Sequence, residues 1–97
     1  MKRARFLLPA EEEMLSAAAY YEAQAPGLGG GFLQKVDAAI RDISEHPERW
    51  PVIRSQVRRR LVHRFPYGVF YRVDPEEVVI LAVADLRRRP NYWISRR

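Results

Sequence analysis

The chain has 97 residues, of which 47% are hydrophobic and 30% are charged, and it carries a formal net charge of +5. This size and composition predict one folded domain over residues 1–97, with too little chain for a second core. The sequence lacks cysteine, which excludes disulfides, thiolate metal sites and a cysteine nucleophile; with only two histidines, we expect neither a metal nor a cofactor.

Nothing near the N-terminus predicts export or membrane insertion. The apolar run over residues 6–8 stops at Pro9, which is too short for the core of a signal peptide or for a membrane span. We therefore expect a cytoplasmic protein that does not associate with a membrane.

Positive charge is concentrated in the second half of the chain. Residues 1–49 contain six Lys and Arg against eight Asp and Glu, whereas residues 50–97 contain eleven Arg against four acids, so the halves carry −2 and +7. Because Arg binds phosphate and carboxylate groups through two parallel hydrogen bonds, this half indicates nucleic acid or an acidic protein segment as partner. The alternative is a basic face that is simply solvated.

The first half of the chain predicts a strand over residues 3–8 and then two helices. Pro9 suits the first turn of a helix, and the acidic residues after it complement the helix dipole. The apolar face of this helix recurs every three or four residues, at Met14, Ala18, Tyr21 and Ala25. A second helix is expected from Leu28 or Gly29 to His46, where Pro47 ends it. The short link predicts an antiparallel helical hairpin.

The second half predicts strands. They are expected at residues 51–54 (a short edge strand), 57–65, 67–73 and 78–84, separated by turns rich in proline. The last of these is apolar on both faces, which predicts an interior strand that is covered from both sides. Because two helices cover only one face of a sheet, the C-terminal tail, residues 85–97, or a partner chain must shield the other face.

A series of short segments runs in order along the whole chain: FLLPAE at 6–11, AYYE at 19–22, PGLG at 26–29, PERWP at 47–51, RLVHRFPY at 60–67, YRV at 71–73, LAVA at 81–84 and RRRPNYW at 87–93. The series resembles the RelE/ParE superfamily of toxins from type II toxin–antitoxin, or plasmid stabilisation, systems. The PNYW ending and the paired tyrosines resemble the ParE branch more than the RelE branch.

The resemblance implies a RelE/ParE-like α+β fold with one strand, two helices and three or four further strands. The helical hairpin would lie on one face of a mainly antiparallel sheet. It also implies a cognate antitoxin as partner. Three activities remain open: a ParE-like toxin that inhibits growth through DNA gyrase, a RelE-like ribosome-dependent endonuclease that cuts mRNA, and a non-toxic relative that only binds antitoxin. We favour the gyrase inhibitor, and whether the chain is an enzyme stays open.

Arg87, Arg88 and Arg89 are the leading candidates for a binding site. They follow the central strand, where a rigid scaffold can present them to a partner. In a nuclease, one of them would stabilise charge on the scissile phosphate; in a binding protein, they would pair with carboxylates. The alternative is a basic exit loop that keeps the protein soluble.

The strand expected at 57–65 adds a second basic group. A period of two places Arg58, Arg60 and Arg64 on one face, as a stripe that phosphate could follow, although charged strands also serve to prevent edge pairing. His63 falls on the opposite, more apolar face, so we expect a packed histidine rather than a general base.

Three aromatic residues, Tyr92, Trp93 and Trp50, have different expected roles. Tyr92 could bind a partner, stack on a base or assist proton transfer, whereas Trp93 is expected to cover the sheet, and Trp50 to join the core. If the chain were a nuclease, Arg87, Tyr92 and Arg64 would be its catalytic residues. Asp85 stands where many members of the superfamily place a histidine, which weakens the nuclease interpretation.

Overall fold

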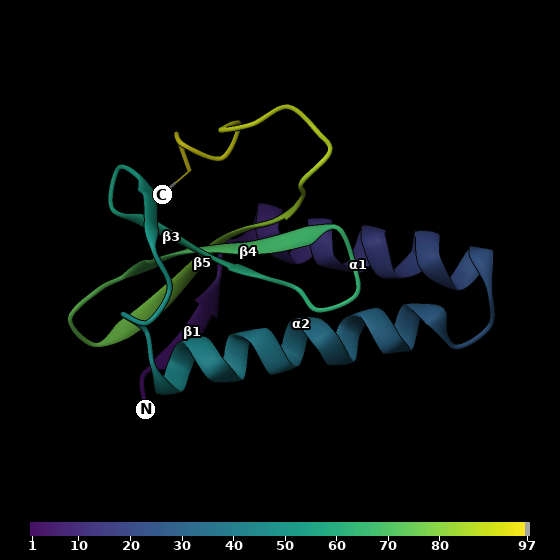
Figure 1. Cartoon of the computed structure of the whole chain (residues 1–97), viewed down its shortest axis with the longest axis horizontal. Coiled ribbons are helices and arrows are strands. Elements are labelled where there is room, and N and C mark those ends of the chain that lie inside the picture. Colours follow the sequence, from purple (N-terminus) through teal and green to yellow (C-terminus); the bar gives the residue numbers. More distant parts are fainter. Residues whose placement is uncertain (97) are drawn as a thin grey trace.

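A strand, two helices and four more strands follow one another along residues 1–96, the part of the chain that the computed structural model describes (Figure 1). The elements are β1 (Arg3–Phe6), α1 (Leu8–Gln24), α2 (Leu28–Glu45), β2 (Val52–Arg54), β3 (Val57–Leu61), β4 (Tyr67–Val73) and β5 (Glu77–Asp85). The strands form one sheet in the order β1-β5-β4-β3-β2. Only β1 and β5 pair in parallel, so the sheet is mainly antiparallel, as expected.

The two helices form the expected antiparallel hairpin, which Figure 1 shows beside the sheet. Pro9 lies in the first turn of α1, and the link to α2 turns at Gly27, whose φ of 87° is in the left-handed region that favours glycine. The Glu22 carboxylate accepts the N–H groups of Gly27 and Gly29 at 2.9 and 3.0 Å. These bonds lower the pKa of Glu22 and satisfy donors that the start of α2 would otherwise leave free.

One face of the sheet packs against the helices. Its core combines residues of both layers: Ala10, Ala17, Ala18, Phe32, Val36, Ala39, Ile43, Val62, Val69, Tyr71, Val78, Ile80 and Val83. Tyr67, Val69, Tyr71 and Val73 lie on this face together, as the alternation in the sequence predicts. Trp50 packs against the same cluster, which confirms its expected place at the core.

The other face of the sheet is covered by residues 86–96, which we call the C-terminal arm. Trp93 from the arm is only 2% exposed, and its ring lies 4.9 Å from that of Phe70. A second core forms here from Val57, Phe70, Val79, Leu81, Ala82, Ala84 and Trp93. The two-sided apolar character of β5 is thus explained: β5 is an interior strand between β1 and β4, covered by helices on one face and by the arm on the other. Arg97 lies outside the described residues.

The structure corrects two expected strand ends. β1 stops at Phe6 because α1 already begins at Leu8. β3 stops at Leu61 rather than at residue 65, because the chain reverses before β4: the backbone N–H of Val62 donates to the carbonyl of Tyr67, and Arg64 adopts a φ of 71°. Over residues 1–96, no helix combines the length and apolar character that crossing a membrane requires.

Candidate functional site

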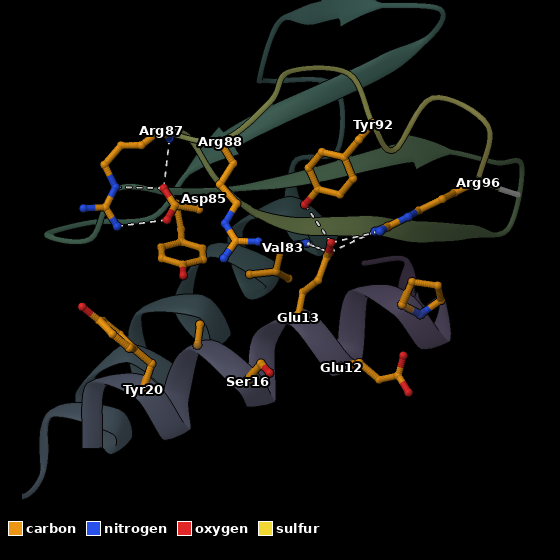
Figure 2. A pocket seen from close by; sticks show the side chains of 13 residues that line it. Glu12, Glu13, Ser16, Tyr20, Val83, Asp85, Arg87, Arg88, Tyr92 and Arg96 are labelled. Atoms are coloured by element: carbon orange, nitrogen blue, oxygen red, sulfur yellow. Dashed lines mark hydrogen bonds and ion pairs between the residues drawn. The ribbon is translucent and has the colours of Figure 1, made fainter. Parts of the chain in front are cut away.

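An open groove of about 640 Å³ lies between α1, the end of β5 and the C-terminal arm (Figure 2). Three parts of the fold line it: Pro9, Glu12, Glu13, Ser16, Ala17 and Tyr20 from α1, Tyr67, Val83 and Asp85 from the sheet, and Arg87, Arg88, Tyr92 and Arg96 from the arm. The groove therefore brings together three of the expected binding residues, Arg87, Arg88 and Tyr92, with helix side chains that the sequence alone did not connect to them.

Asp85 holds Arg87 at one end of the groove. Its carboxylate accepts the Nε and Nη2 groups of Arg87 at 3.0 and 2.9 Å and the backbone N–H of Arg87 at 2.9 Å. The side-chain hydrogen bond from Arg87 is the main reason that the pKa of Asp85 is lowered. Asp85 consequently remains a carboxylate near neutral pH, and much of the charge of Arg87 is compensated within the chain.

Glu13 binds the arm at the other end of the groove (Figure 2). The Tyr92 hydroxyl donates to its Oε2 at 2.7 Å, and the Arg96 guanidinium donates to both of its oxygens at 2.9 and 3.0 Å. Burial is the largest cause that raises the pKa of Tyr92, and the hydrogen bond to Glu13 raises it further. Tyr92 therefore keeps its proton throughout the physiological range.

Sequence reasoning missed Glu13, which it treated only as one of three glutamates that complement the helix dipole. A signal was present in the spacing. Glu13 lies three residues after Ala10 and four before Ala17, both buried, so it stands on the inward side of α1, whereas Glu11 and Glu12 are exposed.

Arg88 differs from its two neighbours. Figure 2 shows its side chain reaching from the arm into the groove, between the Asp85–Arg87 and Glu13–Arg96 pairs. It makes no side-chain hydrogen bond or ion pair with any residue in the described range 1–96. Arg89 does not line the groove; it lines a smaller hollow of about 110 Å³ on the arm-covered face of the sheet, which Arg88 also borders. The three consecutive arginines thus occupy three environments, and Arg88 is the one whose charge is available to a ligand in the groove.

The second basic group is not one continuous stripe. Arg58 and Arg60 share a face, as expected, but both are engaged within the chain. Arg58 donates to the carbonyl of Trp50 at 2.6 Å, and Arg60 pairs with Asp42 of α2 at 2.5 Å. Arg64 lies in the turn after β3 and is exposed, so it is separated from the other two.

His63 is exposed in that same turn, which corrects the expectation of a packed histidine. The physical reason is that β3 ends two residues earlier, so the alternation that placed His63 on an inner face no longer applies. His63 does not line the groove.

A helical hairpin on one face of a mixed five-stranded sheet, with a basic C-terminal arm bound at β5 and a charged groove between them, defines a two-layer α+β protein. Residues 4–90 match the model of the family described as the ParE toxin of the type II toxin–antitoxin system parDE. The chain belongs to this family, and the resemblance to the ParE branch is confirmed.

The comparison with solved structures agrees on the fold. A chain from the structure titled "Chromosomal ParDE TA system from P. aeruginosa" superposes with a TM-score of 0.79 at 16% sequence identity, covering 90% of this chain and 98% of that chain. At this identity, the likeness shows a shared fold. No protein with a curated description matches the chain.

Proposed function

We propose that residues 1–97 form a single toxin domain that inhibits growth by binding DNA gyrase, and that a cognate antitoxin neutralises it. The observation that carries the proposal is the state of the titratable groups beside Arg88. Cleavage of RNA requires one group to take a proton from the 2′-hydroxyl and another to give a proton to the leaving oxygen. A toxin that acts by binding has no such requirement.

The groups in the groove are poorly suited to proton transfer. The Tyr92 hydroxyl donates to Glu13, and the raised pKa of Tyr92 keeps it protonated at neutral pH, so it is not available as a base. The lowered pKa of Asp85 keeps it deprotonated there, so it has no proton to give, and its oxygens already accept hydrogen bonds from Arg87. What remains is a basic and aromatic surface around Arg88, Tyr20 and Tyr67, which suits an acidic segment of a protein partner or a DNA-bound target.

An antitoxin is expected from the family and from exposed apolar surface on α1. Leu8, Leu15 and Tyr20 are 64%, 54% and 57% exposed. These residues lie on the helix that forms one wall of the groove, so a partner segment could cover them while it occupies the groove. Both the antitoxin and gyrase would be met in the cytoplasm.

Expression of the chain without an antitoxin tests the proposal. We expect growth arrest together with a DNA-damage response, intact mRNA on translating ribosomes, and inhibition of purified gyrase in a supercoiling assay. Arg88→Ala should abolish the growth arrest, the DNA-damage response and the inhibition of gyrase. Arg54→Ala, which removes an exposed arginine from the edge strand β2, should preserve all three.

Two outcomes would contradict the proposal. Ribosome-dependent mRNA cleavage that is lost in Arg87→Ala or Tyr92→Phe would establish the RelE-like activity instead. Antitoxin binding without any growth arrest would establish a non-toxic relative.

A further inference from the structure

The edge of β5 is completed by side chains where its neighbouring strand ends. β1 pairs with β5 only from Glu77 to Ile80. Further along the same strand, the N–H of Val83 donates to Glu13 at 3.1 Å, and the carbonyl of Leu81 accepts from Arg96 at 3.0 Å. The Glu13–Arg96 ion pair therefore supplies both a donor and an acceptor to backbone groups of β5.

Glu13 is nearly saturated by this arrangement. Its carboxylate receives the Tyr92 hydroxyl, two N–H groups of Arg96 and the Val83 amide, which together use most of the acceptor sites of two oxygens. The side chains of Glu13 and Arg96 are only 22% and 19% exposed. A charge-assisted network that is largely withdrawn from solvent is stronger than the same contacts on an open surface.

The attachment brackets the one arm residue that is fully seated on the sheet. Tyr92 and Arg96 flank Trp93, and the Arg96 guanidinium also lies 5.0 Å from the centre of the Tyr92 ring. With both flanks bound to Glu13, the Trp93 indole is held against Phe70. Arg88 stands at the other end of the same arm, above the groove.

We propose that Glu13 is the positioning residue of the C-terminal arm: by joining α1, β5 and the arm through one carboxylate, it keeps Trp93 on the sheet and Arg88 over the groove. The inference rests on the proposed role of the arm as a partner-binding surface. It assigns to a helix residue, far from the arm in sequence, control over how that surface is presented.

The test compares Glu13→Gln with Glu11→Gln in the full chain. Glu11 is the control because it is a neighbouring glutamate of α1 that is exposed, in the first turn of the helix, where its charge complements the helix dipole. Both variants are made in a Trp50→Phe background, so that Trp93 is the sole tryptophan. Glutamine keeps one acceptor oxygen but loses the charge that Arg96 pairs with.

We expect acrylamide quenching of Trp93 to rise toward that of a free indole in Glu13→Gln, well below the unfolding transition, and the Val83 amide to lose protection from hydrogen exchange. Glu11→Gln should leave both quantities unchanged. A merely structural role would lower the midpoint of unfolding without exposing Trp93 in the folded protein. A Glu13→Gln variant that unfolds earlier but shields Trp93 as the parent does would therefore overturn the inference.

Growth arrest is scored separately for the same substitutions in the otherwise unchanged chain. Glu13→Gln should weaken arrest and Glu11→Gln should not; a released arm with undiminished arrest would also overturn the positioning role. If the parent chain causes no arrest, the proposed function fails, but quenching and exchange still decide whether Glu13 holds the arm.

Discussion

Two of the three consecutive glycines at the start of α2, Gly29 and Gly30, provide a test of how closely the helices pack. A Cβ added at Gly29 would overlap the carbonyl oxygen of Ala18 in α1 and would lie 2.9 Å from the Cβ of Glu22, whereas carbon atoms prefer separations of about 3.5–4.0 Å. A Cβ added at Gly30 would meet nothing within 4 Å. Neither position has a positive φ, so backbone strain does not enter the comparison.

The expected free energies follow from these contacts. Replacing a helical glycine with alanine stabilises by about 0.5–1 kcal/mol, and we expect the lower end in a first turn. Overpacking costs about 1–3 kcal/mol, because the close neighbour of Gly29 is backbone that cannot move aside. The helix-propensity gain is common to both variants, so the difference in unfolding free energy between Gly30→Ala and Gly29→Ala should be about 1–3 kcal/mol.

Chemical denaturation of the two variants and the parent measures this difference. Gly30→Ala should unfold at a slightly higher denaturant concentration than the parent and Gly29→Ala at a lower one, with equal slopes. In thermal unfolding, each kcal/mol corresponds to about 4–8 °C for a domain of this size. Equal midpoints for the two alanine variants would refute the close approach of α1 and α2 at Gly29.

Three further predictions concern the groove and its partner. The pKa of Tyr92 is raised in the folded protein, so its contribution to stability is complete below its unfolded value of about 10 and is lost as the pH rises above it. In Tyr92→Phe, the free energy of unfolding should therefore depend less on pH across the alkaline range. The pKa of Asp85 is lowered, so its contribution to stability is present above its unfolded value of about 3.9 and is lost as the pH falls below it. Asp85→Asn should therefore lose less stability than the parent when the pH is lowered from neutral to below this value. An equal loss in both proteins would argue against the Arg87 contact. Adding the cognate antitoxin should raise the Tm with the logarithm of its free concentration, and a Tm that is indifferent to it would count against partner binding.

The sequence predicts the architecture well because each element carries its own local signal. Pro9, Gly27 and Pro47 mark helix boundaries through backbone geometry, and the apolar residues on both faces of β5 require an interior strand. The end of β3 was missed because the alternation continues into residues 62–65, although the chain has already turned. A periodic pattern does not reveal where hydrogen bonding to the next strand stops.

The site was predictable only in outline. Arg87, Arg88 and Arg89 are consecutive residues of the same type, so the sequence does not distinguish them. Their different environments depend on Asp85, on the groove and on the path of the arm. Glu13 acquires its role from Arg96, a contact between residues 83 positions apart. Side-chain pairs of this separation are set by tertiary packing, so local patterns do not contain them.

The pairing of β1 with β5 sets the order in which the protein can assemble on the ribosome. In this pairing Arg3 lies beside Glu77 and Phe6 beside Ile80, so β1 has no partner until synthesis has reached β5. The helical hairpin, whose contacts are local, can form early, but its apolar stripe has no sheet to cover until β4 and β5 emerge. The groove and its arginines form only after these strands, because Arg87, Arg88 and the rest of the C-terminal arm follow β5 in the chain.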